Sequence, residues 1–442
     1  MRIAVVGAGY LGSVHAACMA HQGHDVVAID LDEAKIRSLA DGEAPFFEPG
    51  LDELLAQALD TGRLRFTTEY RDAAEAQVHF ICVGTPQRAG EYAADTSYVL
   101  SAGRSLAPHV AAGALVVGKS TVPVGTAIQL RRILTSESGA EVRLAWNPEF
   151  LREGLAIKDT LEPGRLVYGI SSPAATGDVE LLDVVYAPQL AVGTPRIILD
   201  YATAELVKVS ANAFLATKIS FINAIADVCE AAGADVVALA DAIGLDPRIG
   251  RDYLNAGLGF GGGCLPKDIR GFMARAGELG ADQVLTFLRE VDAINMRRRE
   301  RMLDLAREEC GGTLIGKRIA VLGAAFKPNS DDIRDSPALD VAMAAKKLGA
   351  TITVHDPKAI AHAKARAPEL SYSCGVEVAC WQADVVLLLT EWQEYRDLDP
   401  AELIGTVRFP CVVDGRNALD PNRWRAAGWK YRALGRPKVL DL

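Results

Sequence analysis

Short apolar runs, most of which lead into glycine, threonine or proline, recur along the first 150 residues of the chain. They read "IAVV" at 3–6, "VHFICVGTP" at 78–86, "ALVVGKSTVPVGT" at 114–126 and "VRLAWNPEF" at 142–150. Near-continuous apolar runs of this kind are typical of parallel strands that are buried on both faces. Because helical patterns lie between them, the alternation predicts an α/β fold with a mostly parallel sheet.

The first run leads into a glycine signature, in the segment "RIAVVGAGYLG". A helical pattern follows to about Gln22, and a second strand, "DVVAID", ends at Asp30. In such a motif Gly7 allows the tight turn, Gly9 lets the backbone meet a pyrophosphate, and Gly12 packs the helix on the strand. The pyrophosphate then sits at a helix N-terminus, which favours an anion. The segment therefore predicts a dinucleotide site.

Asp30 sets the expected cofactor. It lies where a carboxylate accepts hydrogen bonds from the adenine ribose hydroxyls. The next residues are Leu31 and Asp32, so no arginine follows that would hold a 2′-phosphate. We therefore expect NAD rather than NADP.

Polar residues follow three of the predicted strands. Thr85, Thr121 and Glu149 each come just after an apolar run. Ligands of open α/β sheets collect at the carboxyl ends of the strands, so we expect these residues near a ligand.

The pattern changes to a long helix from about Ala202. Residues 203–233 hold no internal glycine or proline and are apolar nearly all round, which predicts a buried helix. Lys208 and Asn212 share one face of it. A buried lysine needs a partner or a task, although a lysine that snorkels from a half-buried helix is the alternative.

Residues 316–442 echo the start of the chain. "GKRIAVLGAAFKP" resembles the first strand and turn, and "ITVHDP" and "DVVLLLTEW" resemble the next two strands. Ala324 and Lys327 replace the later glycines, so a second dinucleotide is not expected here. Lys327, Arg334 and Arg416 lie near strand ends, where they bind phosphate or sugar or are solvated surface cations. We expect two Rossmann-like, doubly wound units joined by a long helical region, with domains at 1–201, 202–312 and 313–442.

The stretch "LGFGGGCLPKD" at 258–268 surrounds Cys264 with glycines. Glycine gives the backbone access to positive φ and to close approach, at an entropic cost. A nucleophilic thiol explains that cost, whereas a small buried hydrophobe in a loop is the alternative.

Composition narrows the class of protein. The 442 residues are half hydrophobic and carry a formal net charge of −10, with a pI of about 5.3. This charge argues against nucleic acid or an anionic membrane as partner. No apolar run suggests a membrane span, and glycines interrupt the signal-peptide-like start. The eight cysteines are scattered without metal-ligand spacing, which favours reduced thiols, no metal and a cytoplasmic location.

Seven segments, in order, resemble the UDP-glucose 6-dehydrogenase family of nucleotide-sugar dehydrogenases. They are "GAGYLG" at 7–12, "VGTP" at 83–86, "KSTVPVGT" at 119–126, "NPEFLREG" at 147–154, "AELVKVSANAFLATKISFIN" at 204–223, "GFGGGCLPKD" at 259–268 and "FKPNSDDIRDSP" at 326–337. The resemblance implies oxidation of UDP-glucose to UDP-glucuronate with two NAD⁺, a homodimer, and a product that enters polysaccharide synthesis. One departure is visible, because Gly263 stands where many members have a serine before the cysteine.

The resemblance also assigns roles by position. The implied catalytic residues are Cys264, Lys208, Asn212, Asp268, Thr121 and Glu149. The expected cofactor contacts are Gly7, Gly9, Tyr10, Leu11, Gly12, Asp30, Lys35, Thr85, Thr121, Glu153, Lys267 and Arg334. The implied substrate contacts are Glu149, Phe150, Leu151, Arg152, Glu153, Lys208, Asn212, Arg248, Tyr253, Leu254, Asn255, Ala256, Gly257, Gly261, Lys327 and Arg416. Of these, Arg248 matches an arginine that reaches the substrate of the neighbouring subunit.

A nucleophilic thiol explains how a single site can oxidise an alcohol first to an aldehyde and then to a carboxylic acid. A thiolate adds to the intermediate aldehyde, the thiohemiacetal gives up a second hydride, and the thioester is hydrolysed. Such a site must favour the thiolate. Lys208 and Asn212 can steady an oxyanion, while Asp268, Thr121 or Glu149 can move the proton or orient water.

Three other readings stay open. GDP-mannose and UDP-N-acetylmannosamine dehydrogenases share the chemistry, although residues 147–169 and 246–268 look more like the UDP-glucose branch. A 3-hydroxy acid dehydrogenase shares the architecture and the Lys/Asn helix pair, but it consumes one NAD and needs no cysteine. A non-enzymatic NAD-binding regulator is the third, and the presence of Cys264, Lys208 and Asp268 together argues against it.

Overall fold

The computed structural model describes residues 1–172, 174–281 and 283–437. The chain divides into two compact units. The first contains Met1–Ala211 and Arg270–Gly280, and the second contains Asn212–Ile269 and Ala281–Leu442. Each unit is described by itself below.

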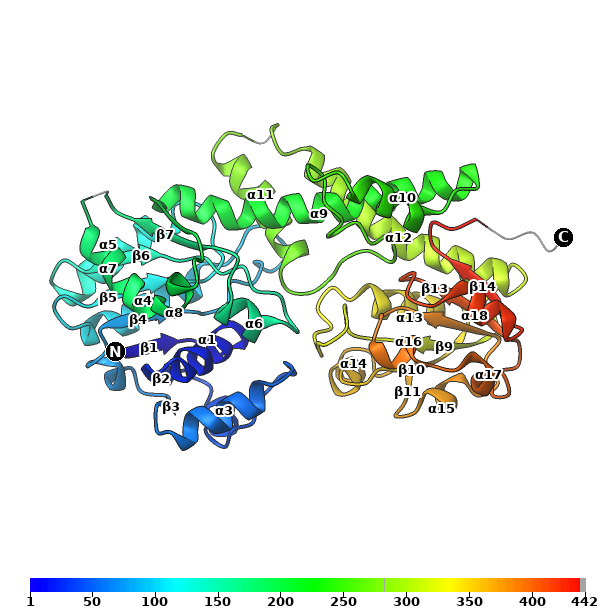
Figure 1. The fold of residues 1–442 in the computed structure, drawn as a ribbon, viewed down its shortest axis with the longest axis horizontal. Coiled ribbons are helices and arrows are strands. Elements are labelled where there is room, and N and C mark those ends of the chain that lie inside the picture. The colour runs from blue at the N-terminus through cyan, green and yellow to red at the C-terminus, as the bar shows by residue number, and fades with distance from the viewer. Residues whose placement is uncertain (173, 282, 438–442) are drawn as a thin grey trace. The chain divides into compact units, whose positions relative to one another are not determined.

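The first unit is built on an eight-stranded sheet, with strand order β3-β2-β1-β4-β5-β6-β7-β8 among the described residues (Figure 1). Every pair is parallel except β6 and β7. The first six strands have the Rossmann order, which confirms the predicted doubly wound unit. The strands are β1 (Arg2–Val6), β2 (Asp25–Ile29), β3 (Leu64–Thr67), β4 (Val78–Ile81), β5 (Leu115–Gly118), β6 (Arg143–Trp146), β7 (Leu166–Ile170) and β8 (Arg196–Asp200).

Helices cover both faces of this sheet, so the central strands are buried on both sides. One apolar cluster lies under α1, α3 and α6, and the other lies under α4 and α5. This double burial is the reason that the strands are continuous apolar runs in the sequence. The helices of this unit are α1 (Tyr10–His21), α2 (Glu33–Ala40), α3 (Leu51–Asp60), α4 (Ser97–Leu106), α5 (Thr126–Ser138), α6 (Ala156–Leu161), α7 (Thr176–Val185) and α8 (Ala187–Ala191).

The second unit repeats the architecture with a six-stranded, all-parallel sheet of order β11-β10-β9-β12-β13-β14 within the described chain. This confirms the second Rossmann-like unit. Its strands are β9 (Arg318–Leu322), β10 (Thr351–His355), β11 (Ser371–Ser373), β12 (Val385–Leu388), β13 (Cys411–Asp414) and β14 (Lys430–Ala433). Its helices are α10 (Val236–Gly244), α12 (Phe287–Glu309), α13 (Pro337–Lys347), α14 (Ile360–Arg366), α15 (Val376–Cys380), α16 (Gln393–Arg396), α17 (Pro400–Leu403) and α18 (Pro421–Ala426).

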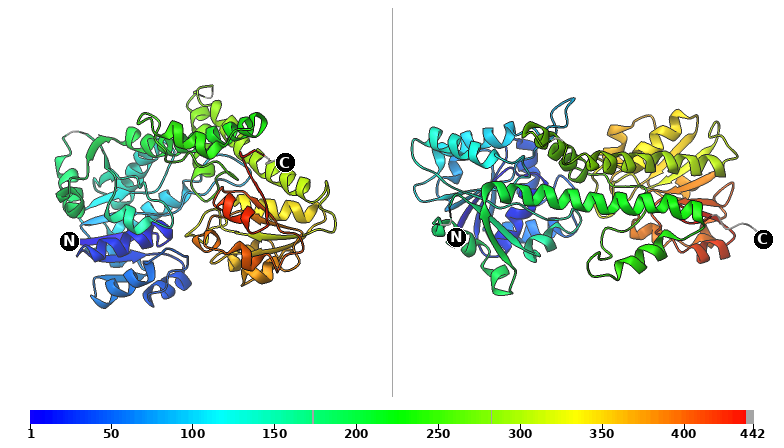
Figure 2. Two further views of the ribbon diagram at one scale, coloured as in Figure 1. Left: turned by 45° about the vertical axis from the view of Figure 1, so that its right-hand side comes forward. Right: turned by 90° about the horizontal axis from the view of Figure 1, so that it is seen from above.

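Two helices contain residues of both units. The helix α9 (Tyr201–Ala232) begins in the first unit and continues into the second. The helix α11 (Leu265–Glu278) begins in the second unit and continues into the first. Figure 2 shows α9 as one unbroken helix. This is the long central helix that the sequence predicts.

The expectation that α9 is buried all round is wrong for the single chain. Phe214, Phe221 and Val228 are 66%, 50% and 60% exposed. They recur every seven residues and so share one face of the helix. The other faces are covered, and they hold the buried polar residues Glu205 and Lys208.

By length and composition α9 is also apolar enough to cross a membrane, which the sequence analysis did not expect. The core helix of a globular protein meets the same criterion. Lys208 is only 4% exposed on α9, and its ammonium group pairs with the carboxylate of Glu149 inside the first unit.

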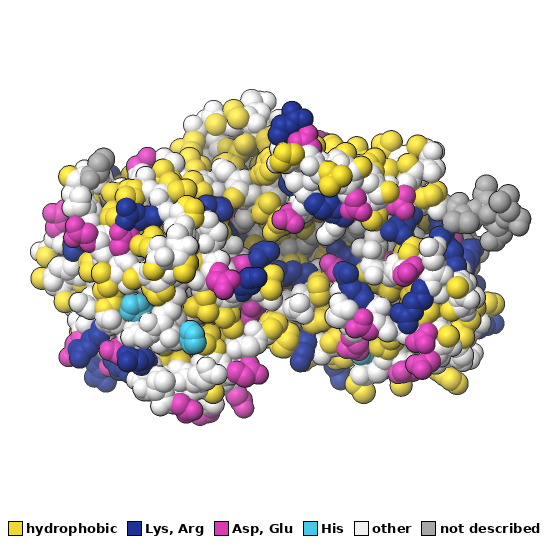
Figure 3. Space-filling view, viewed as in Figure 1, with side chains coloured by type: hydrophobic (Ala, Val, Ile, Leu, Met, Phe, Trp, Pro, Cys, Tyr) yellow, Lys and Arg dark blue, Asp and Glu magenta, His cyan; other side chains and the backbone are white. Residues whose placement is uncertain are grey.

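Charged side chains of both signs are interspersed over the face of the molecule shown in Figure 3. A chain with a net charge of −10 therefore still presents cations locally. Binding of an acidic ligand depends on where these cations gather.

Candidate functional site

The glycines of the first turn have the separate tasks that the motif predicts. Gly7 has φ +94°, which a side chain rarely tolerates. A Cβ atom on Gly12 would lie 1.7 Å from the carbonyl oxygen of Gly7, so the helix α1 packs on the turn only with glycine there. A Cβ on Gly9 would meet nothing within 4 Å, so the backbone at that position faces open space. Together with the N-terminus of α1, which Tyr10 and Leu11 begin, this geometry fits a pyrophosphate.

Asp30 lies at the end of β2 beside this turn. Its carboxylate accepts hydrogen bonds from the backbone N–H of Ala8 at 2.9 Å and from the ammonium group of Lys35 at 2.9 Å. Its side chain is 15% exposed, so it keeps a surface for a ribose hydroxyl. The Lys35 side chain, from α2, balances its charge. The neighbouring Asp32 caps α2 and adds a further negative charge, which disfavours a 2′-phosphate.

A buried glutamate, which the sequence analysis missed, connects the glycine turn to the segment 147–154. Glu48 is 5% exposed and accepts a hydrogen bond from the hydroxyl of Tyr10. It also accepts the backbone N–H groups of Gly154 at 2.6 Å and Ala156 at 2.7 Å. Glu48 therefore supplies the N-terminal cap of α6 and fixes the loop that carries Glu153.

The ends of β4 and β5 are joined by another side chain of the predicted site. The hydroxyl of Thr85 donates to the carbonyl oxygen of Thr121 at 2.7 Å, and the hydroxyl of Ser120 donates to that of Val83 at 2.7 Å. Thr85 is 6% exposed, whereas Thr121 is half-buried. The backbone carbonyl group of Thr121 therefore holds this residue in place, and the Thr121 hydroxyl takes no part in that hydrogen bond.

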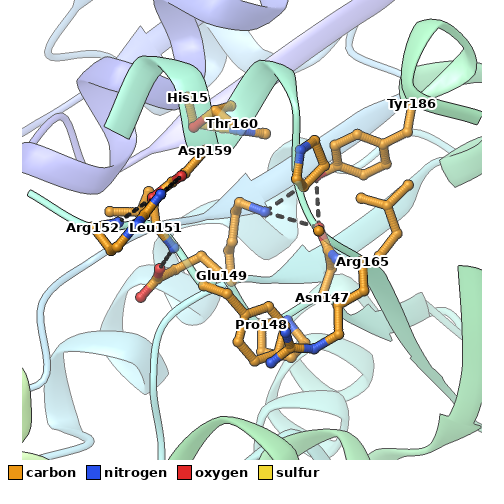
Figure 4. Close-up of a pocket in the computed structure, with 15 residues that line it drawn as sticks. His15, Asn147, Pro148, Glu149, Leu151, Arg152, Asp159, Thr160, Arg165 and Tyr186 are labelled. Atoms are coloured by element: carbon orange, nitrogen blue, oxygen red, sulfur yellow. Dashed lines mark hydrogen bonds and ion pairs between the residues drawn. The ribbon is translucent and has the colours of Figure 1, made fainter. Parts of the chain in front are cut away.

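A cavity of ≈ 230 Å³ lies at the ends of β5 and β6, within the first unit. Figure 4 shows Asn147 and Tyr186 turned toward one ammonium group there, which belongs to Lys119. Lys119 donates to the Asn147 carbonyl oxygen at 2.9 Å and to the Tyr186 hydroxyl at 3.2 Å. Burial lowers the pKa of Lys119 to about 8. The network supports the turn that leads to Glu149.

Glu149 and Lys208 form a buried ion pair at 3.0 Å, with side chains 11% and 5% exposed. The other oxygen of Glu149 accepts the backbone N–H of Leu151 at 2.7 Å. The Lys208 ammonium also lies 5.6 Å from the ring centre of Phe150, and the Arg165 guanidinium stacks at 3.7 Å from it. Lys208 therefore has a partner, so the snorkelling alternative is wrong.

Arg152 is committed to a partner in its own segment. Its guanidinium makes two hydrogen bonds to Asp159, at 2.9 and 2.7 Å, and both side chains are labelled in Figure 4. A substrate contact by Arg152 would share the guanidinium with this ion pair.

In the second unit, Cys264 immediately precedes α11, and its carbonyl oxygen accepts the backbone N–H of Asp268 at 2.9 Å. Cys264 is exposed, as is Cys374, whereas the other six cysteines are buried. Burial raises the pKa of Cys82 and Cys380 to about 12 each. The interpretation of Cys264 as a buried packing residue is therefore wrong. Its place at the positive end of a helix dipole favours an anionic sulfur.

Asp268 joins two other predicted residues. It is 4% exposed, and it accepts hydrogen bonds from the Asn212 amide at 2.6 Å and from the Lys267 ammonium at 2.6 Å. Cys264, Asn212 and Asp268 belong to the second unit, whereas Thr121, Glu149 and Lys208 belong to the first.

The glycines around Cys264 serve a purpose that the sequence analysis did not foresee. They let the loop approach other segments of the chain, rather than only a ligand. A Cβ on Gly261 would lie 2.3 Å from the Asp335 carbonyl oxygen, and one on Gly262 would lie 2.7 Å from the Phe326 ring. At Gly263 it would lie 2.3 Å from the Arg334 guanidinium, which fills the space that a serine side chain would need.

Arg416 holds this loop in place through hydrogen bonds to backbone carbonyl groups. It is 11% exposed at the side chain and donates to the carbonyl oxygens of Gly259 at 2.7 Å, Leu389 at 2.8 Å and Phe326 at 3.1 Å. It is therefore not a solvated surface cation. Arg334 is exposed and pairs with Asp332 at 2.7 Å.

The predicted substrate segment 253–257 lies in the same unit. Tyr253 has φ 66°, a strained conformation for a tyrosine, and Leu254 and Ala256 are buried. Asn255 is exposed and accepts from Arg251, and the N–H of Gly257 donates to Asn223 at 2.8 Å. Further along the chain, the Lys327 ammonium lies 5.3 Å from the Phe326 ring centre, and Arg248 is 87% exposed and pairs with Asp246 at 2.6 Å.

Asp356 shows why the second unit differs from the first. It lies where Asp30 lies in the first unit, but it is only 1% exposed. Its oxygens accept four backbone N–H groups and the Trp392 indole N–H. A carboxylate with five donors has little capacity left for a ribose, which agrees with the prediction that no second dinucleotide binds here.

The residues that sequence reasoning missed all act through contacts distant in sequence. Lys119 and Asn147 stand inside motifs that were recognised, and Glu48 lies outside them, but the partners of all three come from other elements. A polar residue directly after a buried strand was the one available signal, and it applies to Lys119 and Asn147.

Comparison with known proteins identifies the family. Models of the UDP-glucose/GDP-mannose dehydrogenase family match the chain in three parts: the NAD binding domain at 1–190, the central domain at 202–297 and the UDP binding domain at 320–421. The NAD binding domain supports NAD as the cofactor, as predicted.

Relatives match over nearly the whole chain. The UDP-glucose 6-dehydrogenase of Rhizobium meliloti is 42% identical over 99% of this chain and 100% of its own length. The UDP-glucose 6-dehydrogenase TuaD of Bacillus subtilis is 40% identical over 99% of this chain and 94% of its own. Among solved structures, the UDP-glucose dehydrogenase of Pyrobaculum islandicum is 37% identical, with a TM-score of 0.89 over 98% of both chains. The UDP-D-ManNAc dehydrogenase of Pyrococcus horikoshii is 29% identical, with a TM-score of 0.86 over 99% of this chain and 100% of its own. The chain therefore belongs to the UDP-glucose/GDP-mannose dehydrogenase family.

Proposed function

We propose that the chain is an NAD-dependent UDP-glucose 6-dehydrogenase, which oxidises the C6 alcohol of UDP-glucose to the carboxylate of UDP-glucuronate. The full-length similarity to enzymes named for that reaction supports the substrate. The observation that carries the proposal is an exposed Cys264 at the start of α11, one helical turn from the buried Asp268–Asn212 pair.

When bound, NAD would supply the hydride acceptor for each of the two oxidations. Asp30 and the turn at Gly9 would hold its adenosine and pyrophosphate. The sulfur of Cys264 forms a bond to C6 of the aldehyde, and the thiohemiacetal oxygen takes a proton. Loss of the second hydride from C6 and of the proton from the hydroxyl oxygen gives the thioester. Water then adds to the thioester, the C–S bond breaks, the carboxylate is released, and the sulfur regains a proton.

Two sets of residues, one in each unit, are proposed to divide this work. Asn212 and Lys267 hold Asp268 in place, which keeps a buried carboxylate near the thiol for proton transfer. Lys208, oriented by Glu149, is the cation suited to steady a developing alkoxide. Both groups are buried, and buried charges act strongly on a reacting oxygen.

The stoichiometry of NADH tests the proposal. UDP-glucose, UDP-N-acetylmannosamine and GDP-mannose are each supplied in limiting amount, and the NADH released per sugar nucleotide is counted. We expect two NADH from UDP-glucose and the highest kcat/KM for it. A higher kcat/KM for another sugar nucleotide would place the chain elsewhere in the family, and one NADH per substrate would exclude the thioester route.

We further propose a homodimer built on α9. Phe214, Phe221 and Val228 form an exposed apolar face on that helix, and Leu245 beyond α10 is 85% exposed. Contact with a second copy would remove these side chains from water. The exposed Arg248 would then be available to the substrate of the partner subunit. A cytoplasmic location stays a prediction.

A further inference from the structure

We propose that Glu205 is a positioning residue, which holds the Thr121 loop at a fixed place relative to the helix that carries Lys208. The proposal rests on the proposed function for the meaning of Thr121 and Lys208. The clamp itself stands on contacts within the first unit.

Glu205 lies on α9, one helical turn before Lys208. Its side chain is directed away from solvent, and the residue is 2% exposed. One carboxylate oxygen accepts the backbone N–H of Gly125 at 2.7 Å, and the other accepts that of Ala127 at 2.6 Å. Both N–H groups belong to the start of α5.

The helix α5 has no cap of its own. Gly125 stands at its N-cap position with φ 99°, and it has no side chain that can accept the first N–H groups of the helix. A residue distant in sequence does so instead. The negative charge also lies at the positive end of the α5 dipole.

The loop between β5 and α5 is held at other points as well. Thr85 binds the carbonyl oxygen of Thr121, and the Arg275 guanidinium donates to that of Val124 at 3.0 Å. Lys119 is fixed by Asn147 at the start of the loop. Of these contacts, Glu205 provides the one that joins the loop to α9.

The chemistry of the carboxylate argues for a task beyond packing. Burial raises the pKa of Glu205 to about 6, although the bound N–H groups and Arg275 oppose the shift. Ionisation at neutral pH therefore disfavours the folded state slightly. A neutral glutamine of the same shape would avoid that cost, yet it would offer only one acceptor oxygen to the two N–H groups.

The test compares Glu205→Gln with Asp384→Asn. Asp384 is a matched control, because it is also a buried carboxylate (5% exposed) bonded to a backbone N–H, that of Arg318 at 2.8 Å. It lies in the second unit, directly before β12, and it is not one of the residues proposed to act on substrate. Amide hydrogen exchange, thermal stability and kcat for UDP-glucose are measured on the full-length proteins.

For Glu205→Gln we expect at least about tenfold faster exchange at one of the two amides, Gly125 or Ala127, because the single amide oxygen of glutamine accepts from only one of them. We expect kcat to fall about tenfold or more, with KM for UDP-glucose changed less than about threefold and Tm within a few degrees of the unaltered protein. Asp384→Asn should lower Tm while leaving kcat and the α5 amides unchanged.

Unchanged exchange at Gly125 and Ala127 would overturn the clamp. Faster exchange with an unchanged kcat, or a fall in kcat that only follows a fall in Tm, would overturn the positioning role. If the unaltered protein does not oxidise UDP-glucose, the proposed function fails, and the exchange measurement still decides the clamp.

Discussion

At the scale of single residues, Cys264 and Cys82 show how the fold separates two kinds of thiol. Cys82 is buried beside the sheet, where its pKa rises to about 12, so it stays protonated at neutral pH. Cys264 lies at the surface, before the first turn of α11. Because the thiolate is the nucleophile, the position rather than the residue type decides reactivity.

Replacement of Cys264 is the direct test of the covalent route. Cys264→Ala should leave the binding of NAD and UDP-glucose nearly unchanged, because a thiol contributes little to affinity. Turnover of Cys264→Ala or Cys264→Ser should fall by several orders of magnitude, as measured by steady-state NADH release. Intact-protein mass spectrometry should find an ester-linked sugar nucleotide on Cys264→Ser. Near-normal turnover of either variant would refute the thioester mechanism.

Asp30 controls the choice between NAD and NADP. In the unaltered enzyme its carboxylate should accept the ribose hydroxyls and repel a 2′-phosphate. Asp30→Ala should narrow the preference for NAD over NADP by lowering kcat/KM for NAD. The substitution would also remove the 2.9 Å partner of the Lys35 ammonium, and that cation would then favour the 2′-phosphate of NADP. The ratio of the two kcat/KM values checks this. Equal values in the unaltered enzyme would contradict the assignment.

At the scale of elements, the ends of β5 and β6 are held by a buried cation. Lys119 has a lower pKa in the folded protein, about 8, than the 10.5 of an exposed lysine. The unfolded chain therefore binds more protons between these values, and stability rises with pH there.

Lys119→Met should abolish this pH dependence. The unfolding free energy of the unaltered protein, relative to the variant, should rise by roughly 2 kcal/mol between pH 8 and pH 10. Denaturant unfolding at the two pH values measures the difference. Comparison with the variant removes the contributions of cysteines and tyrosines that titrate in the same range. A constant difference would show that Lys119 has the same pKa in the folded and the unfolded protein, so that burial does not lower it.

The same elements show what a sequence can predict. The strands were predictable because burial on both faces leaves near-continuous apolar runs, and the first turn was predictable because Gly7 and Gly12 are required by local geometry. The clamps by Glu48 and Glu205 were not, because each binds backbone N–H groups from another part of the chain. Backbone groups carry no sequence signal.

The exposed face of α9 was predictable only in part. Apolar composition indicates that a surface leaves water, but it does not say whether the same chain or a second copy covers it. Phe214 and Phe221 are exposed in the single chain, while Ala213 and Ala216, on either side of Phe214, are buried. The helical position of each residue, rather than its type, separates the two groups.

At the scale of the whole molecule, the proposed dimer makes a prediction about shared sites. Cys264→Ala and Arg248→Ala should each be nearly inactive alone. If Arg248 acts on the site of the partner subunit, a mixture exchanged into heterodimers has one site with both residues intact and should regain activity. Sedimentation of each variant as a dimer is the control. No recovery in verified heterodimers would place Arg248 in the site of its own subunit, and a fully active monomer would exclude the dimer.

Because six of the eight cysteines are buried, thiol labelling of the folded protein can measure how much of the proposed site is occupied. A mild alkylating reagent applied to the folded protein meets two accessible thiols, Cys264 and Cys374. A sugar nucleotide at the proposed site would shield the first and leave the second as an internal reference. The ratio of the two labelled peptides would then report how many sites are occupied, even in a cell extract and without following turnover.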